Sequence, residues 1–174
     1  MSLTSAYPFP DINGLSEELR AELKRRRSLN VYRMLMHSPS FAPAYCAMAD
    51  VLLRNSSLPD TLREMIILRV GHRYKAPYEL YHHEKLARKA GVSDVVIAAL
   101  EPGAGFSALS EQERQVIEMV DEVLGHHGLS VQSRDASAKV FTPTQLADFI
   151  FTIGFYQLVC NFLTTFGVPL EIEE

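Results

Sequence analysis

The chain has 174 residues, of which 47% are hydrophobic and 22% are charged, and its net charge is -4. These values are typical of one soluble globular domain, and the length is short for two domains. The acidic balance gives no electrostatic reason to expect nucleic acid or an anionic membrane as a partner. No apolar stretch is expected to span a membrane, and the opening residues MSLTSAYPFP lack the pattern of a signal peptide. We therefore expect a cytoplasmic protein.

Helical patterns follow one another along the chain, and strand patterns are nearly absent. Helices are expected within these segments, in chain order: 15–27, 29–37, 40–55, 58–75, 77–91, 92–103, 107–128 and 142–167. Four of these segments contain a residue suited to a helix N-cap near their start: Ser16, Ser93, Ser110 and Thr142. Glu113 completes a capping box with Ser110, and Gly91 and Gly167 suit helix ends. The pattern predicts a single all-α domain over 1–174.

The centre of this arrangement is a pair of helices at about 59–75 and 77–90. The first is apolar on almost every side around Ile66, Ile67 and Leu68, which is typical of an enclosed helix. Two adjacent β-branched isoleucines could also favour a strand, but the length and the flanking charged residues favour a helix. Pro77 suits the first turn of the second helix. We expect the two helices to form an antiparallel pair.

The second central helix carries a polar cluster in the segment YKAPYELYHHEKLARKAG, residues 74–91. Residues four apart share one face of a helix, so Glu79 lies beside His83, and Tyr78 lies beside His82 on a neighbouring face. A carboxylate next to an imidazole raises the pKa of the histidine and orients its ring. The spacing therefore favours an acid–base site.

Two other interpretations compete with this one. Glu79 and His82 have the Glu-x-x-His spacing of di-iron bundles, although the chain holds no second copy, and zinc would need His72, His82 and His83 to converge. The cluster could also be the solvent-exposed face of an ordinary helix. Glu64 opposes that reading, because it stands among apolar residues of the preceding helix and a buried carboxylate needs a partner.

The segment LPDTLREMIILRVGHRYKAPYELYHHEKLARKAGVSDVVIAAL, residues 58–100, resembles the core motif of the carboxymuconolactone decarboxylase family, which includes alkylhydroperoxidase D. The family pattern is a glutamate, a Cys-x-x-Cys pair that begins twelve residues later, and a histidine four residues beyond the pair. Counting back from the end of the second helix places Glu64 and His83 at the glutamate and histidine positions. The resemblance implies an alkylhydroperoxidase D-like helical bundle with a core at 39–127, an N-terminal helical extension at 1–38 and a long C-terminal helix at 142–168.

The chain departs from that pattern at both cysteine positions, which hold Ala76 and Glu79. Peroxide reduction by a dithiol needs one thiolate to attack and a second thiol to resolve the sulfenic acid. Cys46 and Cys160 lie elsewhere in apolar helical patterns, and we expect buried free thiols rather than a disulfide. The resemblance therefore implies a member without thiol peroxidase activity.

The resemblance, together with the remaining polar residues, implies a cofactor-free lyase of aromatic catabolism that acts on a small carboxylated or lactone substrate. The expected catalytic residues are His83, Glu79 and Glu64. The expected substrate-binding residues are Tyr78, His82, Arg73 and Arg69, although Arg69 could instead pair with an acidic neighbour such as Glu64. Tyr156 and Asn161 of the last helix are expected to serve the core rather than a pocket.

Two alternatives stay open. The protein could be a non-catalytic oligomeric member that binds a small molecule, with the polar cluster holding helix register. An alkylhydroperoxidase would require Cys46 or Cys160 to lie exposed beside His83. The apolar segment DFIFTIGFYQLVCNFL, residues 148–163, has more hydrophobic surface than a small monomer needs, and the family forms oligomers. We expect a homo-oligomer, from dimer to hexamer, whose other partner is the small-molecule substrate.

Overall fold

The computed structural model describes residues 7–171, and this part of the chain is helical without any β-strand. Its helices are, in chain order, η1 (Ile12–Gly14), α1 (Glu17–Arg25), α2 (Asn30–Leu35), α3 (Ala42–Arg54), α4 (Asp60–Tyr74), α5 (Pro77–Ala90), α6 (Asp94–Ala99), α7 (Glu111–His126), α8 (Val131–Ser137) and α9 (Pro143–Phe166). The all-α prediction is confirmed. Residues 1–6 of the expected N-terminal extension lie outside the described part.

The predicted central pair is confirmed as α4 and α5, which form a helical hairpin with a very short connection. Lys75 ends α4 in the left-handed conformation, with φ of 51°, and its N–H bonds to carbonyls of the last turn. The two helices approach closely at Gly71, where an added Cβ would lie 3.0 Å from Cδ2 of Leu80. Glycine at this position therefore lets α5 pack tightly along α4.

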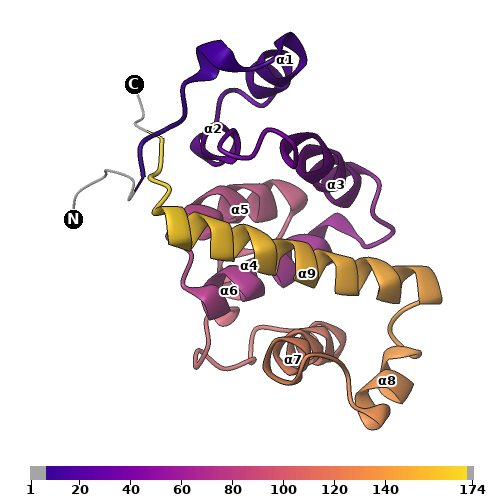
Figure 1. The fold of residues 1–174 in the computed structure, drawn as a ribbon. Helices are drawn as coiled ribbons and strands as arrows, with labels where there is room; N and C mark the ends of the chain where they lie inside the picture. Colours follow the sequence, from indigo (N-terminus) through magenta and orange to yellow (C-terminus); the bar gives the residue numbers. More distant parts are fainter. Residues whose placement is uncertain (1–6, 172–174) are drawn as a thin grey trace.

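Helix α4 lies at the centre of the molecule and packs against α5, α7 and α9. Figure 1 shows α9 lying across one face, with α1–α3 on one side of it and α7 and α8 on the other. The core comes from all of these elements. Its largest fully buried apolar side chains are Phe149, Met34, Met65, Ile66, Ile67, Leu68, Leu100, Ile117 and Ile153. The all-round apolar pattern of α4 is thus explained by enclosure.

Helix α9 corrects one expectation from the sequence. By length and composition alone it is apolar enough to cross a membrane, contrary to the prediction that no stretch would qualify. However, 44% of its most apolar window is buried within the protein, where Phe149 and Ile153 fill the core. Its exposed apolar residues, Ile150, Phe151 and Leu158, are those that a homo-oligomer interface would cover. Self-association stays a prediction.

The predicted helix caps are confirmed at three of four positions. The side chain of Ser16 accepts a hydrogen bond from the N–H of Leu19, and Ser110 forms the expected capping box with Glu113. Thr142 also caps α9 through its side chain. Ser93 occupies the N-cap of α6, but its side chain makes no capping hydrogen bond. Local capping chemistry therefore sets the starts of α1, α7 and α9.

Helix α8 is not predicted by the sequence pattern. Its sequence VQSRDAS has no apolar period, so it carries no amphipathic signal. Ser130 nevertheless caps it by accepting a hydrogen bond from the N–H of Ser133. The N–H of Ser130 in turn donates to Oε1 of Glu122 at 2.7 Å, which ties α8 to α7. A cap and a tertiary contact thus replace hydrophobic periodicity here.

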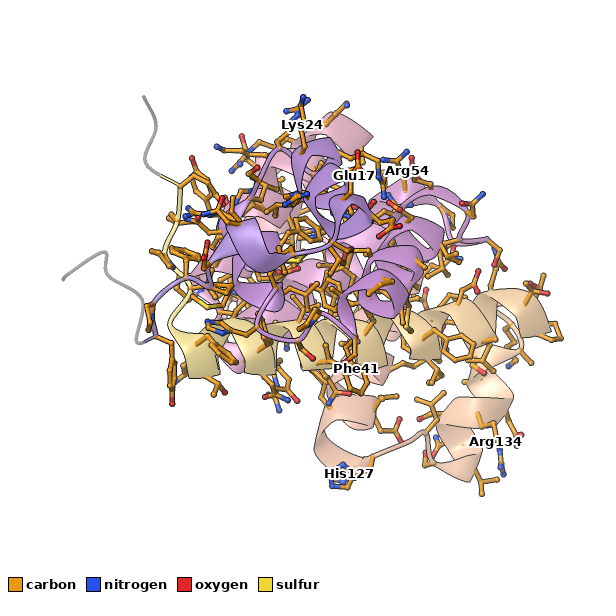
Figure 2. The ribbon with its side chains drawn as sticks, turned by 45° about the horizontal axis from the view of Figure 1, so that its top comes forward. Glu17, Lys24, Phe41, Arg54, His127 and Arg134 are labelled. Atoms are coloured by element: carbon orange, nitrogen blue, oxygen red, sulfur yellow. The ribbon has the colours of Figure 1, made fainter. Side chains whose placement is uncertain are left out.

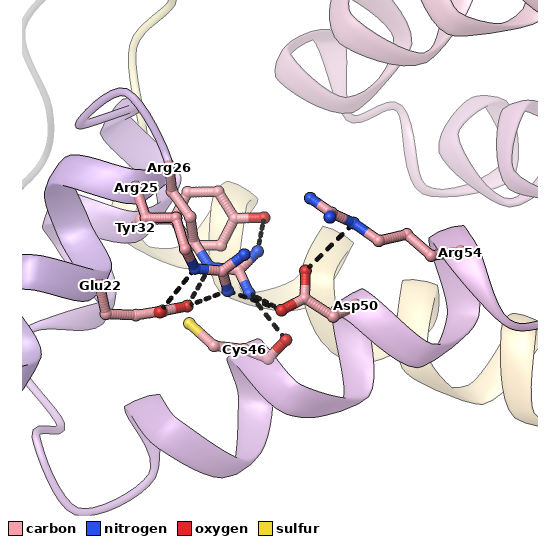
Figure 3. A network of polar contacts seen from close by, with 7 residues as sticks. All are labelled: Glu22, Arg25, Arg26, Tyr32, Cys46, Asp50 and Arg54. Atoms are coloured by element: carbon pink, nitrogen blue, oxygen red, sulfur yellow. Dashed lines mark hydrogen bonds and ion pairs between the residues drawn. The ribbon is translucent and has the colours of Figure 1, made fainter.

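The basic run at the end of α1 attaches this helix to α3 (Figure 3). Arg26 donates to Oε1 of Glu22 at 2.6 Å, to Oδ2 of Asp50 at 2.8 Å and to the carbonyl of Cys46 at 2.8 Å. Its guanidinium also lies over the ring of Tyr32. By contrast, Lys24 and His127 are exposed, and Figure 2 shows them at the edge of the molecule.

Candidate acid–base site

The site is built around His83 of α5, which lies between two carboxylates. Nδ1 of His83 is 2.7 Å from Oε2 of Glu64 on α4. Nε2 of the same ring is 3.1 Å from Oε1 of Glu79, one turn earlier on α5. All three side chains are buried. The α4–α5 hairpin and the spacing of four residues on α5 therefore bring the three predicted catalytic residues together.

Arg63 of α4 completes the cluster. Its Nη2 donates to Oε1 of Glu64 at 3.1 Å, and its Nη1 donates to Oδ1 of Asp60 at 2.7 Å. Glu64 is therefore held from both sides, by a guanidinium and by the ring of His83. A buried carboxylate needs such compensation, because leaving it unpaired costs several kcal/mol. Glu64 is fixed in place and orients the histidine.

Both ring nitrogens of His83 lie within ion-pair distance of a carboxylate, and Nδ1 makes a hydrogen bond to Glu64. Burial by itself lowers the pKa of His83, but the carboxylates of Glu79 and Glu64 outweigh burial and raise the pKa to about 10. The two carboxylates therefore favour the protonated form of His83.

This pairing makes the stability of the protein depend on pH. The folded protein binds the proton of His83 more tightly than the unfolded chain, whose histidine titrates near 6.5. The stabilisation is thus fully present below pH 6.5 and is lost as the pH rises toward about 10. We expect the free energy of unfolding of the wild-type protein to fall more steeply over this window than that of His83→Gln. Urea denaturation at pH 6, 7.5 and 9 measures the two slopes, and equal slopes would contradict the pairing.

A cavity of about 450 Å³ opens beside the cluster. It is lined by residues of α2, α3, α5 and α9, among them Glu79, His83, Tyr78, His82, Tyr45 and Tyr156. The ring of Tyr156 stands edge-on to the ring of His83, with centroids 5.1 Å apart. Glu64 is not part of the lining. His83 and Glu79 thus form the wall, and Glu64 lies behind them.

Glu79 has an oxygen available for chemistry. Its Oε1 lies within ion-pair distance of His83 but is buried without a hydrogen bond. A buried carboxylate oxygen normally accepts at least one hydrogen bond. Oε1 of Glu79 therefore faces Nε2 of His83 and can accept a proton that leaves this nitrogen.

The predicted substrate-binding residues separate into two groups. Tyr78 and His82 line the cavity. Arg69 and Arg73 do not, because their guanidinium groups turn toward α7. Arg69 donates to both carboxylate oxygens of Asp121 and to the carbonyl of Leu100, so the alternative of a pair with Glu64 is also wrong. Arg73 is half-exposed and lies 3.8 Å from Asp121.

Tyr78 and His82 are also contacted by the segment that follows α9. The hydroxyl of Tyr78 donates to Oε1 of Glu171 at 2.6 Å, and Nε2 of His82 is 2.8 Å from Oε2 of the same carboxylate. Burial and the neighbouring Glu171 raise the pKa of Tyr78, so its hydroxyl keeps its proton and acts as a donor. Both side chains are therefore engaged by a carboxylate.

The three histidines considered as zinc ligands do not converge. His72 lines a separate depression with Lys75 and Pro77 on the far end of the hairpin. Within residues 7–171, no group of three His, Cys, Asp or Glu side chains is arranged to hold a metal ion. His82 and His83 each have a glutamate as their partner instead.

The thiols lie apart from the cavity. Cys46 and Cys160 are free and buried, as expected, and neither lines the cavity. Burial raises the pKa of the Cys46 thiol to about 11 and that of Cys160 still further, which disfavours the reactive thiolate. Ala76, at the first family cysteine position, is buried at the start of α5.

Two residues of the site, Arg63 and Glu171, are not expected from the sequence, and Tyr156 lines the cavity although it was assigned to the core. Arg63 is adjacent to Glu64 in the chain, so the need of a buried carboxylate for a cation could have indicated it. Tyr156 is a polar-tipped residue in an apolar helix, a pattern that fits both a core and a pocket. No sequence pattern indicates Glu171, because its partners Tyr78 and His82 lie 93 and 89 residues away in sequence. Asn161, the other residue assigned to the core, is exposed.

Residues 39–122 match the sequence profile of the Carboxymuconolactone decarboxylase family. No curated protein matches the chain. Among solved structures, it is similar to a peroxidase-related protein with an alkylhydroperoxidase AhpD core from Ralstonia eutropha JMP134, with a TM-score of 0.84, 20% identity, and coverage of 96% of this chain and 92% of the other. A peroxidase-related protein from Silicibacter sp. TM1040 gives a TM-score of 0.83, 16% identity and the same two coverages, 96% and 92%.

A third similar structure is a variant of the debrominase Bmp8 in complex with 2,3,4-tribromopyrrole. Its TM-score is 0.75, its identity is 13%, and the match covers 97% of this chain and 94% of that protein. At these identities the structures establish the fold alone. The alkylhydroperoxidase D-like helical fold that the resemblance implied is thereby confirmed.

Proposed function

We propose that this protein, whose residues 39–122 match the carboxymuconolactone decarboxylase family, is a cofactor-free acid–base lyase acting on a small carboxylated or lactone substrate. The observation that carries this proposal is the orphaned Oε1 of Glu79 on the cavity wall, 3.1 Å from the charged ring of His83. A proton donor and an acceptor thus meet beside the cavity that Glu79 and His83 help to line.

The proposed reaction is loss of carbon dioxide from an unsaturated lactone acid. The bond between the carboxylate carbon and the ring carbon breaks, and its electron pair moves into the unsaturated lactone carbonyl to give a dienolate. A proton then passes from Nε2 of His83 through the carboxylate of Glu79 to carbon. Glu64, which is held by Arg63, stabilises the imidazolium, and water restores the proton of His83. The substrate itself takes up the electrons.

The arrangement of the thiols supports a route without dithiol chemistry. Ala76 and Glu79 replace the two family cysteines, so no neighbouring thiol could resolve a sulfenic acid at this position. Cys46 and Cys160 are buried away from the cavity. We therefore propose that thiol peroxidase activity is absent.

One observation favours a second candidate, a non-catalytic protein that binds a small molecule. Both ring nitrogens of His83 are engaged by glutamates, which is also what a structural network would require. Both candidates require the pKa of His83 to respond to Glu79, because the two groups are 3.1 Å apart. The candidates differ in turnover, since only a lyase releases carbon dioxide from a lactone acid.

NMR titration of the histidine ring protons tests the relay. In Glu79→Gln we expect the pKa of His83 to fall by about one pH unit or more, which corresponds to about 1.4 kcal/mol of coupling. Glu84→Gln is the matched control, because Glu84 lies next to His83 in sequence but pairs with Arg88. A His83 resonance that titrates like free imidazole, indifferent to Glu79, would remove the basis of the proposal.

A further inference from the structure

The carboxylate of Glu171 occupies a built site at the edge of the cavity. Its Oε1 accepts from the hydroxyl of Tyr78 at 2.6 Å and from the backbone N–H of Asn30 at 2.7 Å. Its Oε2 lies 2.8 Å from Nε2 of His82. Three donors from two helices therefore converge on one carboxylate.

These donors are held in place by contacts other than Glu171. The hydroxyl of Tyr78 accepts from the N–H of Val31 at 3.3 Å, which directs the hydroxyl proton toward the carboxylate. The rings of Tyr78 and His82 lie against each other, with centroids 4.5 Å apart. Tyr78 and Asn30 are buried. These contacts position the donors independently of the Glu171 carboxylate.

The site and the cavity share a wall. Tyr78, His82 and Val31 take part in the Glu171 site and also line the cavity. The remaining lining is mostly apolar or aromatic and includes Tyr45, Leu53, Leu86, Phe155 and Val159. A ligand with a carboxylate at one end and a flat apolar body would therefore match both regions at once.

We propose that the Asn30–Tyr78–His82 site binds the carboxylate of an aromatic or unsaturated carboxylic acid, and that Glu171 is an internal occupant which such a ligand displaces. Glu171 belongs to the short segment 168–171 that follows α9. This segment is attached through a second contact, from Nδ2 of Asn30 to the carbonyl of Pro169 at 3.1 Å. The inference deepens the proposed function, on which it rests for taking the cavity as the substrate site.

Glu171 and the ligand compete for the same donors. The observed association constant is therefore the intrinsic constant multiplied by the fraction of molecules in which Glu171 is released. Removing the carboxylate of Glu171 makes this fraction one and raises the observed affinity. With benzoate as the probe, we expect Glu171→Ala to bind about tenfold or more tightly than the wild-type protein. Glu111→Ala, an exposed glutamate on α7, should bind like the wild type.

Calorimetric titration with benzoate measures these affinities, and the amide resonance of Asn30 reports the site directly. In Glu171→Ala the Asn30 amide should shift as benzoate saturates, and adding Tyr78→Phe should remove most of the gain in affinity. An equal or weaker affinity in Glu171→Ala would overturn the inference, as would tighter binding that leaves the Asn30 amide unmoved. In the unaltered protein, benzoate should shift the Glu171 side-chain carboxyl carbon.

The readouts separate this inference from the proposed lyase activity. Benzoate carries no lactone and needs no proton from His83, so its affinity is measured independently of turnover. If no lactone acid is turned over but Glu171→Ala raises the affinity for benzoate, the lyase proposal fails and the carboxylate site stands. If turnover depends on His83 but Glu171→Ala leaves the affinity for benzoate unchanged, the carboxylate site fails and the lyase proposal stands.

Discussion

Replacing His83 by glutamine is expected to lower kcat for decarboxylation of an unsaturated lactone acid by about 10²–10⁴-fold, the usual contribution of a positioned proton donor. Glutamine is close in size and can still donate a hydrogen bond to Glu64, but it carries no transferable proton. KM should change little, because the site proposed for the substrate carboxylate is formed by Asn30, Tyr78 and His82. The rate of carbon dioxide release from a panel of lactone acids measures the effect.

Glu79→Gln should cause a loss of similar size, and the double variant should be hardly worse than either single one, because the two groups act as a unit. Glu84→Gln on the same helix is the control and should retain wild-type rates. Full activity of His83→Gln would eliminate the proposed relay. An absence of turnover by the wild-type protein across the panel would favour the ligand-binding candidate instead.

Replacing Arg69 by methionine is expected to lower the free energy of unfolding by about 3 kcal/mol, because it removes one partner of a largely buried ion pair. Arg69 is buried and donates to Asp121 and to the carbonyl of Leu100. Asp121 is partly exposed, with 28% of its side chain accessible, so water compensates part of the loss. Urea denaturation at neutral pH measures the change.

Arg73→Met is the matched control for this prediction. Arg73 is 41% exposed in its side chain and lies 3.8 Å from the same Asp121, so its removal should cost less than about 0.5 kcal/mol. Equal losses in the two variants would show that the burial of Arg69 does not matter. If Arg69→Met changed KM without changing the free energy of unfolding, Arg69 would be a substrate-binding residue, as the sequence analysis predicts.

The local part of the structure followed from the sequence. The capping box of Ser110 and Glu113 and the terminating Gly91 act within a few residues of themselves, so they identify helix ends without knowledge of the fold. The contact of Glu79 with His83 follows equally from helical periodicity. The partnership of Glu64 with His83 depends on the α4–α5 hairpin, which the two successive helical patterns predict.

Three features could be read from the amino acids without the fold: the protein is all-helical, α4 is enclosed, and a glutamate and a histidine share one face of α5. Two others depend on how the helices pack. Arg69 turns to Asp121, 52 residues away, and Glu171 reaches Tyr78 and His82. Helical periodicity fixes neighbours within one or two turns, whereas a charged side chain on an enclosed helix pairs with whichever element packs against that face.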